Sequence, residues 1–93
     1  MFLSYQRIAT SATVKGLAEL IIPPKATFAE LQADTGSIRY RLDGGEPSSA
    51  NGMLLLITEP PRMFLIEDLR KISFCQGSGA GNLNIHYGAG RDI

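Results

Sequence analysis

Few side chains in this 93-residue chain are able to do chemistry. One histidine, His86, and one cysteine, Cys75, are too few for a Cys/His zinc site within one chain. His86 could act as a general base. It alternates, however, with two asparagines in the segment 82–87, on the face opposite the apolar side chains. This spacing predicts an exposed or interface position on a strand for His86.

Carboxylates and glycines suggest two other kinds of site. Five acidic residues could pair to hydrolyse a glycosidic bond, but all lie at predicted turns, where carboxylates are common. They are Asp43, Glu46, Glu59, Glu67 and Asp68. The segment Gly77–Gly81 looks like a phosphate-binding loop, but a strand rather than a helix is predicted after it, which favours a flexible hairpin loop. We therefore expect no enzyme, and no catalytic, cofactor-binding or metal-binding residue.

The charge balance and the lengths of the apolar runs argue against several classes of partner and against membrane insertion. Nine basic and nine acidic residues cancel, and neither sign forms a run, so we expect no binding to nucleic acid or to an anionic membrane surface. The first dozen residues lack the apolar core of a signal peptide. The longest apolar run, Met53–Ile57, has five residues against the roughly 20 of a spanning helix. We expect a soluble protein.

Proline and glycine recur at short intervals, which favours short strands over helices. Side chains alternate between apolar and polar in Ser37–Leu42, Lys71–Cys75 and Asn82–Tyr87, which predicts three half-buried strands. Met53–Ile57 and Met63–Ile66 are apolar on both faces, so we expect strands covered on both sides, by their own sandwich or by a neighbouring subunit.

Two segments leave alternatives. In Ala26–Asp34, Thr27 and Glu30 have the spacing of a helix capping box, but a strand with Ala29 and Leu31 inward is favoured because so short a helix is marginal. Residues 1–22 form an N-terminal arm or a first strand. We predict one all-β domain over residues 1–93 with its core in 26–87. It would be a small antiparallel β-sandwich or jelly-roll-like fold with an extended N-terminal arm.

A domain of this size buries little surface, so contact with other subunits would add stability. The candidate interface combines an apolar strip, two arginines on one strand face, and the histidine. Its residues are Met53, Leu55, Ile57, Arg39, Arg41 and His86. For the apolar strip, however, a core strand is favoured over a partner-facing position, and for the two arginines a solvated face is the default.

A resemblance adds to this interpretation. The motifs that carry it are Ala29–Ala33, Ile38–Arg41 with Asp43–Gly44, Pro47, Gly52–Met53 with Leu55, an Asp68–Leu69 turn before Ile72–Phe74, and Leu83–Tyr87. Over residues 26–87 the chain resembles small structural proteins of tailed-bacteriophage particles, of the capsid decoration or cement type. It departs from their pattern at Pro60–Pro61 and in its longer N-terminal segment.

The resemblance implies a β-sandwich or jelly-roll-like module of the virion, assembled in the cytoplasm of the bacterial host, with no catalytic residue. We expect a homotrimer that binds the major capsid protein or other virion proteins. The alternative is a tail, neck or fibre-associated module. A third hypothesis is a ligand-binding or receptor-binding domain that uses Tyr40, Tyr87, His86 and the Gly77–Gly81 loop.

Overall fold

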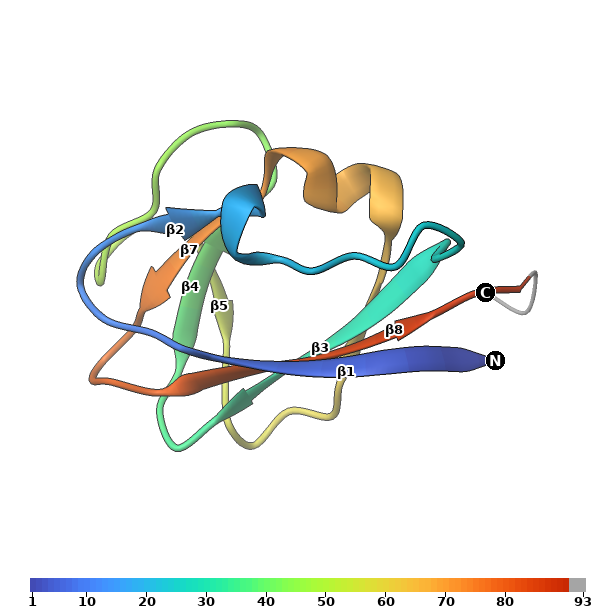
Figure 1. Ribbon diagram of the computed structural model, residues 1–93. Helices are drawn as coiled ribbons and strands as arrows, with labels where there is room; N and C mark the ends of the chain where they lie inside the picture. Colours follow the sequence, from blue (N-terminus) through green and yellow to red (C-terminus); the bar gives the residue numbers. More distant parts are fainter. Residues whose placement is uncertain (91–93) are drawn as a thin grey trace.

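The computed structural model describes residues 1–90, which form two antiparallel sheets that face each other (Figure 1). Sheet A has the order β1 (Phe2–Ala9), β8 (Asn82–Gly88), β3 (Phe28–Asp34) and β6 (Arg62–Leu65). Sheet B has the order β2 (Lys15–Gly16), β7 (Ser73–Gln76), β4 (Ile38–Arg41) and β5 (Met53–Leu55). The predicted all-β sandwich is confirmed.

The strand pairs are nested along the sequence: the first strand pairs with the last, the second with the second-last, and so on inward. β1 pairs with β8, β2 with β7, β3 with β6, and β4 with β5. Successive pairs alternate between sheet A and sheet B, as in a long hairpin rolled into two layers. This is the order of an eight-stranded jelly roll. Only the β4–β5 connection stays within one sheet.

The core lies between the two sheets, where alternate side chains of each strand meet. In β8, Leu83, Ile85 and Tyr87 point inward and are buried, as their alternation predicts. The largest fully buried side chains are Tyr87, Phe74, Leu31, Ile38, Leu55, Leu69, Leu83 and Ile85. Burying each of these contributes roughly 1.5–3 kcal/mol.

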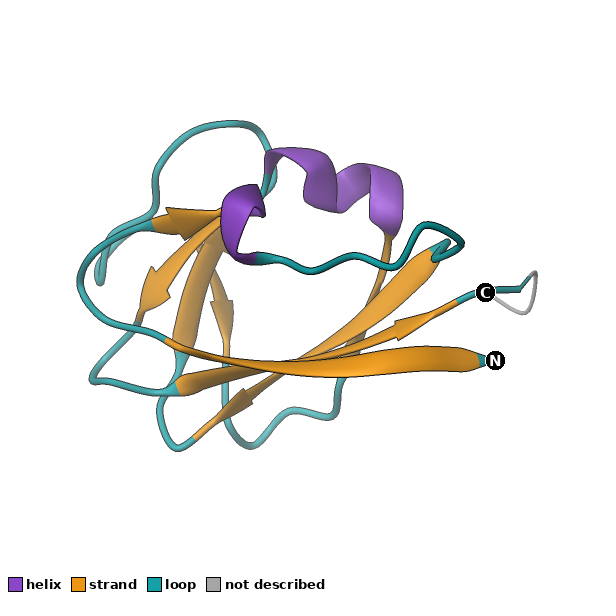
Figure 2. Ribbon diagram, in the orientation of Figure 1, coloured by secondary structure: helices purple, strands orange, loops and turns teal. Residues whose placement is uncertain are grey.

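Two 3-10 helices, η1 (Leu17–Glu19) and η2 (Ile66–Lys71), lie side by side across one end of the sandwich (Figure 2). Ile66 and Leu69 of η2 are buried and close this end of the core. The Asp68–Leu69 turn expected from the sequence lies inside η2. Within residues 1–90, no helix has the length and apolar character needed to cross a membrane.

The segment between η1 and β3 is held by the carboxamide of Gln6. Its Oε1 accepts hydrogen bonds from the Tyr87 hydroxyl at 2.7 Å and from the Ile21 amide at 3.0 Å. Its Nε2 donates to the carbonyl oxygen of Glu19 at 2.6 Å. Burial raises the pKa of Tyr87 to about 12, because the phenolate would lose its hydration. One side chain of β1 thus satisfies polar groups from β8, from η1 and from the η1–β3 connection.

The strand alternative for Ala26–Asp34 is confirmed, since β3 covers Phe28–Asp34. Ala29 and Leu31 point inward as expected, with Ala33. Thr27 and Glu30 do not form a capping box. The Thr27 hydroxyl exchanges hydrogen bonds of 3.2 Å with the backbone of Gly90, and Glu30 points to the outer face of sheet A.

The prediction of a hairpin at Gly77–Gly81 is wrong, because this loop joins β7 in sheet B to β8 in sheet A. It lies against the β3–β4 connection, which crosses between the sheets at the same end. A Cβ on Gly81 would lie 2.5 Å from the carbonyl oxygen of Gly36, so this close approach requires glycine. Of the two alternatives for the N-terminal segment, the structure has a first strand, β1.

Candidate functional site

The large apolar side chains that remain exposed fall into two groups at opposite sides of the sandwich. The β5–β6 margin consists of Met53, Leu56, Ile57, Met63 and Leu65. The β1 margin consists of Met1, Phe2, Leu3, Tyr5 and Ile21. β1 and β6 are the two edge strands of sheet A, and β5 is an edge strand of sheet B. Each margin therefore combines apolar side chains with a strand edge that has no partner within residues 1–90.

The β5–β6 margin is open because β6 buries only one of its faces. Arg62 and Phe64 point toward sheet B, while Met63 and Leu65 point outward and remain 47% and 50% exposed. The sequence predicts cover on both faces of this strand, by the chain's own sandwich or by a neighbouring subunit. The chain's own sandwich covers only the face that carries Phe64.

The turn between β5 and β6 is held by an ion pair. Arg62 Nη2 lies 2.5 Å from Glu59 Oε2, and Arg62 Nη1 donates to the Tyr40 hydroxyl at 2.6 Å. The other Glu59 oxygen accepts a hydrogen bond from the Leu56 amide at 3.0 Å. This amide and the Arg62 guanidinium lower the pKa of Glu59. Leu56 and Ile57 are thus presented to solvent by a turn with a defined shape.

The strand of the β1 margin, β1, lies at the near side of the molecule in Figure 1. β1 pairs with β8 on one side, and no strand of residues 1–90 lies on its other side. The Met1 ammonium donates to the Ala89 carbonyl at 2.9 Å, and the Ala89 amide donates to the Met1 carbonyl at 2.8 Å, which fixes the start of the strand. Ile21 is 76% exposed beside the strand, held there by Gln6. This margin is longer than that of β6, which spans four residues.

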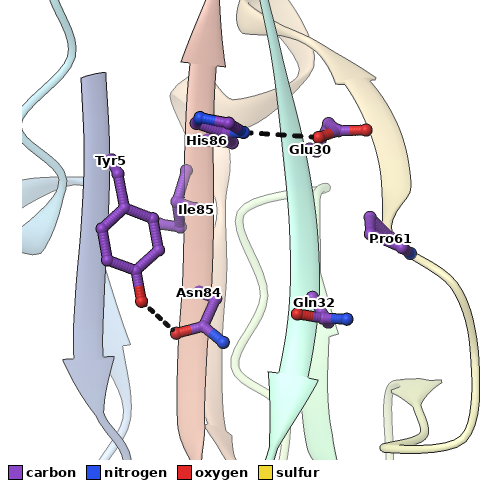
Figure 3. A pocket seen from close by; sticks show the side chains of 7 residues that line it. All are labelled: Tyr5, Glu30, Gln32, Pro61, Asn84, Ile85 and His86. Atoms are coloured by element: carbon purple, nitrogen blue, oxygen red, sulfur yellow. Dashed lines mark hydrogen bonds and ion pairs between the residues drawn. The ribbon is translucent and has the colours of Figure 1, made fainter. Parts of the chain in front are cut away.

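A third surface is a hollow of about 340 Å³ on the outer face of sheet A (Figure 3). Its lining comes from β1, β8, β3 and the approach to β6: Tyr5, Glu30, Gln32, Pro61, Asn84, Ile85 and His86. The Tyr5 hydroxyl donates to Asn84 Oδ1 at 2.8 Å, and His86 Nδ1 lies 3.6 Å from Glu30 Oε1. Gln32 lies opposite Asn84 in the β3–β8 pairing, so two carboxamide side chains lie next to each other in the hollow (Figure 3).

Aromatic rings close one end of this hollow. The Phe2 ring stacks on the His86 ring, with centroids 4.1 Å apart and planes 6° apart. Phe2 also meets the buried Phe28 edge to face at 5.6 Å. Phe28 covers Gly88 of the neighbouring strand, where a Cβ would have no room. His86 is therefore fixed between an aromatic ring and a carboxylate, as an exposed strand residue.

The predicted interface residues do not form one surface. Met53 and Ile57 are exposed on the β5–β6 margin, whereas Leu55 is completely buried. We correct the prediction for Leu55, because its side chain fills the core opposite Ile38 and cannot reach a partner. His86 lies on the outer face of sheet A.

The two predicted arginines lie on the outer face of sheet B. Arg41 binds Asp43 twice, with Nε–Oδ1 and Nη2–Oδ2 distances of 3.0 and 2.7 Å. The hydrogen bonds from Arg41, and to a smaller extent the one from the Gly45 amide, lower the pKa of Asp43 to about 2. Arg39 Nη1 donates to the Gly52 carbonyl at 3.0 Å, while its buried Nε has no partner within residues 1–90. Arg41 thus has a partner within its own hairpin.

Sequence reasoning missed the β1 margin and the hollow. Tyr40 and Tyr87, which it assigned to a ligand-binding surface, are 4% and 0% exposed. That contact set is therefore wrong for both tyrosines, and Tyr5 is the exposed one. For β6 the sequence did indicate an apolar outer face, because the segment 63–66 contains no polar residue that would mark a face toward solvent. Nothing in the sequence indicates which terminal strand lies at a sheet edge.

Among residues 1–90, no group of three or more His, Cys, Asp or Glu side chains lies close enough together to hold a metal ion. No family model, no curated protein and no solved structure matches the chain.

Proposed function

We propose that this chain is a non-enzymatic structural subunit of a tailed-phage virion, and specifically a capsid decoration or cement protein. In this role it stabilises the particle by binding coat subunits and other copies of itself. The motif resemblance over residues 26–87 supports the phage assignment, and an eight-stranded jelly roll is a fold also used in viral capsids. A tail, neck or fibre-associated position is the alternative within the same class.

The observation that carries the proposal is the β5–β6 margin. Two strand edges that have no partner in the described part of the chain lie together there, and five large apolar side chains are exposed beside them. Proteins that act alone protect such edges with charged residues or cover them, because an open apolar edge invites association. A coat subunit would bind this margin by strand pairing and apolar contact.

Quantitative mass spectrometry of purified particles of the encoding phage tests the proposal. Hundreds of copies per particle would support capsid decoration, and about three to twelve would support a position on the tail or portal axis. Absence of the chain from the particles would refute the proposal.

Binding to the particle can be tested separately by cosedimentation of added protein with particles that lack it. We expect the M63K/L65K variant to lose binding, because lysine on an edge strand opposes pairing. The matched control S49K/A80K places two lysines at exposed positions outside both margins and should bind as the wild type does. Equal binding by both variants would contradict a role for the β5–β6 margin.

The hollow on sheet A favours a second candidate, a carbohydrate-binding module of the virion. An exposed aromatic ring, two carboxamides and a carboxylate are the groups that bind sugar rings and their hydroxyls. A glycan array of bacterial surface polysaccharides is the direct test, with Y5A as the variant that should lose any signal. No signal above background for the wild type would eliminate this candidate.

A further inference from the structure

Two peptide bonds in the loop between β4 and β5 join an acidic or amide side chain to a following glycine: Asp43–Gly44 and Asn51–Gly52. In such a pair the glycine nitrogen can attack the side-chain carbonyl carbon of the residue before it, because glycine has no side chain that hinders the approach. We propose that Asn51 is a site of spontaneous deamidation in the folded protein, whereas Asp43 is protected from the equivalent reaction. This inference goes beyond the proposed function and does not rest on it.

The reaction needs only water as a partner. The Gly52 nitrogen bonds to Cγ of Asn51 and gives its proton to water. The bond from Cγ to Nδ2 breaks, and that nitrogen takes a proton from water and leaves as ammonia. The product is a cyclic imide, which water opens at either carbonyl carbon. Addition at Cγ leaves aspartate, and addition at the main-chain carbonyl carbon leaves isoaspartate, in which the main chain runs through Cβ and Cγ. No atom is oxidised or reduced.

The structure leaves both reacting groups accessible. Asn51 is exposed, and its Nδ2 lies 3.5 Å from the Ser48 hydroxyl oxygen, at the outer limit of a hydrogen bond. The Gly52 amide precedes the ladder between β4 and β5, which begins with Met53 opposite Tyr40. The ladder can therefore stay intact while the amide attacks.

The fold also requires glycine at this position. Gly52 has a φ of +119°, which other residues rarely adopt. An added Cβ would lie 3.0 Å from Cβ of Pro47 and 3.2 Å from the Tyr40 carbonyl oxygen. The unhindered amide that deamidation needs is thus a consequence of the geometry of the turn.

Asp43 also precedes a glycine in this loop, but its carboxylate is held. Arg41 donates from Nε and Nη2 at 3.0 and 2.7 Å, and the Gly45 amide donates at 3.1 Å. These hydrogen bonds keep the carboxylate ionised, with a pKa of about 2. Attack by the glycine nitrogen needs a neutral carboxyl, because an ionised one has no adequate leaving group. Asp43 is therefore protected.

Sheet A protects the two remaining asparagines, Asn82 and Asn84. Both lie in β8, which pairs with β1 on one side and β3 on the other, so its amides point at neighbouring strands. The residues that follow them, Leu83 and Ile85, carry bulky and buried side chains. Attack at either asparagine therefore requires local opening of the sheet.

Deamidation alters the turn that leads into the β5–β6 margin. The Asn51 carbonyl accepts a hydrogen bond from the Ser48 amide at 2.9 Å, and in isoaspartate this carbonyl is no longer part of the main chain. The next carbonyl, that of Gly52, accepts from Arg39 Nη1 at 3.0 Å. Met53, an exposed residue of the margin, follows directly. The reaction thus places a negative charge and an additional main-chain atom close to the margin.

Peptide mapping of aged protein tests the proposal. The purified full chain is kept at physiological pH and temperature for several weeks, and circular dichroism checks that it stays folded. Trypsin releases residues 42–62 as one peptide with both glycine pairs, and the peptide that begins at Ile72 carries Asn82 and Asn84. Digestion in water enriched in heavy oxygen marks any reaction that occurs during the digest. Electron-transfer dissociation distinguishes aspartate from isoaspartate.

We expect the peptide 42–62 to gain roughly 1 Da at position 51, in both product forms, at least about tenfold faster than Asn82 or Asn84 reacts. The rate should rise with pH, because the attacking nitrogen must lose its proton. N51Q should show no such gain, because glutamine would have to form a larger ring. In R41M, isomerisation at Asp43 should begin, and R41Q replaces this variant if it unfolds.

A folded protein in which Asn51 stays intact would overturn the proposal. Equal rates at the three asparagines, or isomerisation of Asp43 as fast as deamidation of Asn51 in the wild type, would also overturn it. An Asp43 that stays unchanged without Arg41 would overturn the protection assigned to that arginine. None of these results depends on binding to particles, so the proposed function is tested separately.

Discussion

Gly88 provides a quantitative test of packing on the outer face of sheet A. It lies directly opposite Phe28 in the β3–β8 pairing, and the Phe28 ring covers it. A Cβ at this position would lie 2.7 and 2.8 Å from the two Cε atoms of the ring. The ring has little freedom to move away, because Phe28 is buried and Phe2 packs against it edge to face. Gly88→Ala therefore forces the ring out of its place.

We expect Gly88→Ala to destabilise the protein by about 1–3 kcal/mol, the usual penalty for overpacking a well-filled site. For a domain of this size, each kcal/mol lowers the melting temperature by roughly 4–8 °C. Urea unfolding followed by circular dichroism gives the free energy of unfolding, and a thermal scan gives the midpoint. Gly79→Ala is the matched control, because a Cβ added at Gly79 would have no atom within 4 Å, and we expect it to have little effect.

A double-mutant cycle with Phe28→Leu tests whether the Phe28 ring is what a Cβ at position 88 clashes with. If the ring is the cause, Gly88→Ala should destabilise the Phe28→Leu protein less than the wild type, with a coupling of roughly 0.5–3 kcal/mol. Two results would refute this reasoning. One is a loss below about 0.5 kcal/mol in the wild type, and the other is an equal loss in both backgrounds.

Three further predictions concern titration and burial. Because the pKa of Tyr87 is about 12 in the folded chain against 10.0 ordinarily, its contribution to stability is complete below pH 10 and is lost between pH 10 and 12. Unfolding at alkaline pH should show this loss in the wild type and not in Tyr87→Phe. The pKa of Asp43 is about 2 against 3.8, so its contribution is present above pH 3.8 and is lost as the pH falls toward 2. In Arg41→Met, a carboxyl NMR titration should find that pKa moved back toward 3.8, and an unchanged value would exclude the arginine as the cause. Leu55→Ala should cost about 2–5 kcal/mol in urea unfolding, and Ile57→Ala less than about 0.5, because only the former leaves a cavity. Similar losses would contradict the burial difference.

The strands that the sequence predicts best are those with one buried face. In β8, apolar and polar side chains alternate without exception up to Tyr87, so period 2 suffices to find the strand and its faces. The sequence of β3 is ambiguous because Ala, Glu, Leu and Gln favour a helix locally. Packing resolves the ambiguity, since Ala29 and Leu31 fill the core beside β8, which only a strand places correctly.

Connections between sheets and exposure at edges are harder to predict. A glycine-rich loop of this length fits a hairpin as well as a crossover, and only tertiary packing against Gly36 distinguishes them. Leu55 and Ile57 belong to one apolar run, yet β5 ends between them and a turn carries Ile57 to the surface. Burial there depends on where the strand ends, which an apolar run does not reveal.

The place of β8 in sheet A has a consequence for biosynthesis. β8 lies between β1 and β3, and it is the last of the eight strands to leave the ribosome. Until then β1 has no neighbour in its sheet, and β3 has only β6. Sheet A can thus close only after synthesis of β8, by pairing strands separated by most of the chain, which makes folding slow. Until β8 has been made, the edges of β1 and β3 that it will cover stay unpaired in the nascent chain. Unpaired strand edges favour association between unfinished chains, so misassembly between copies would begin among chains translated close together on one polysome.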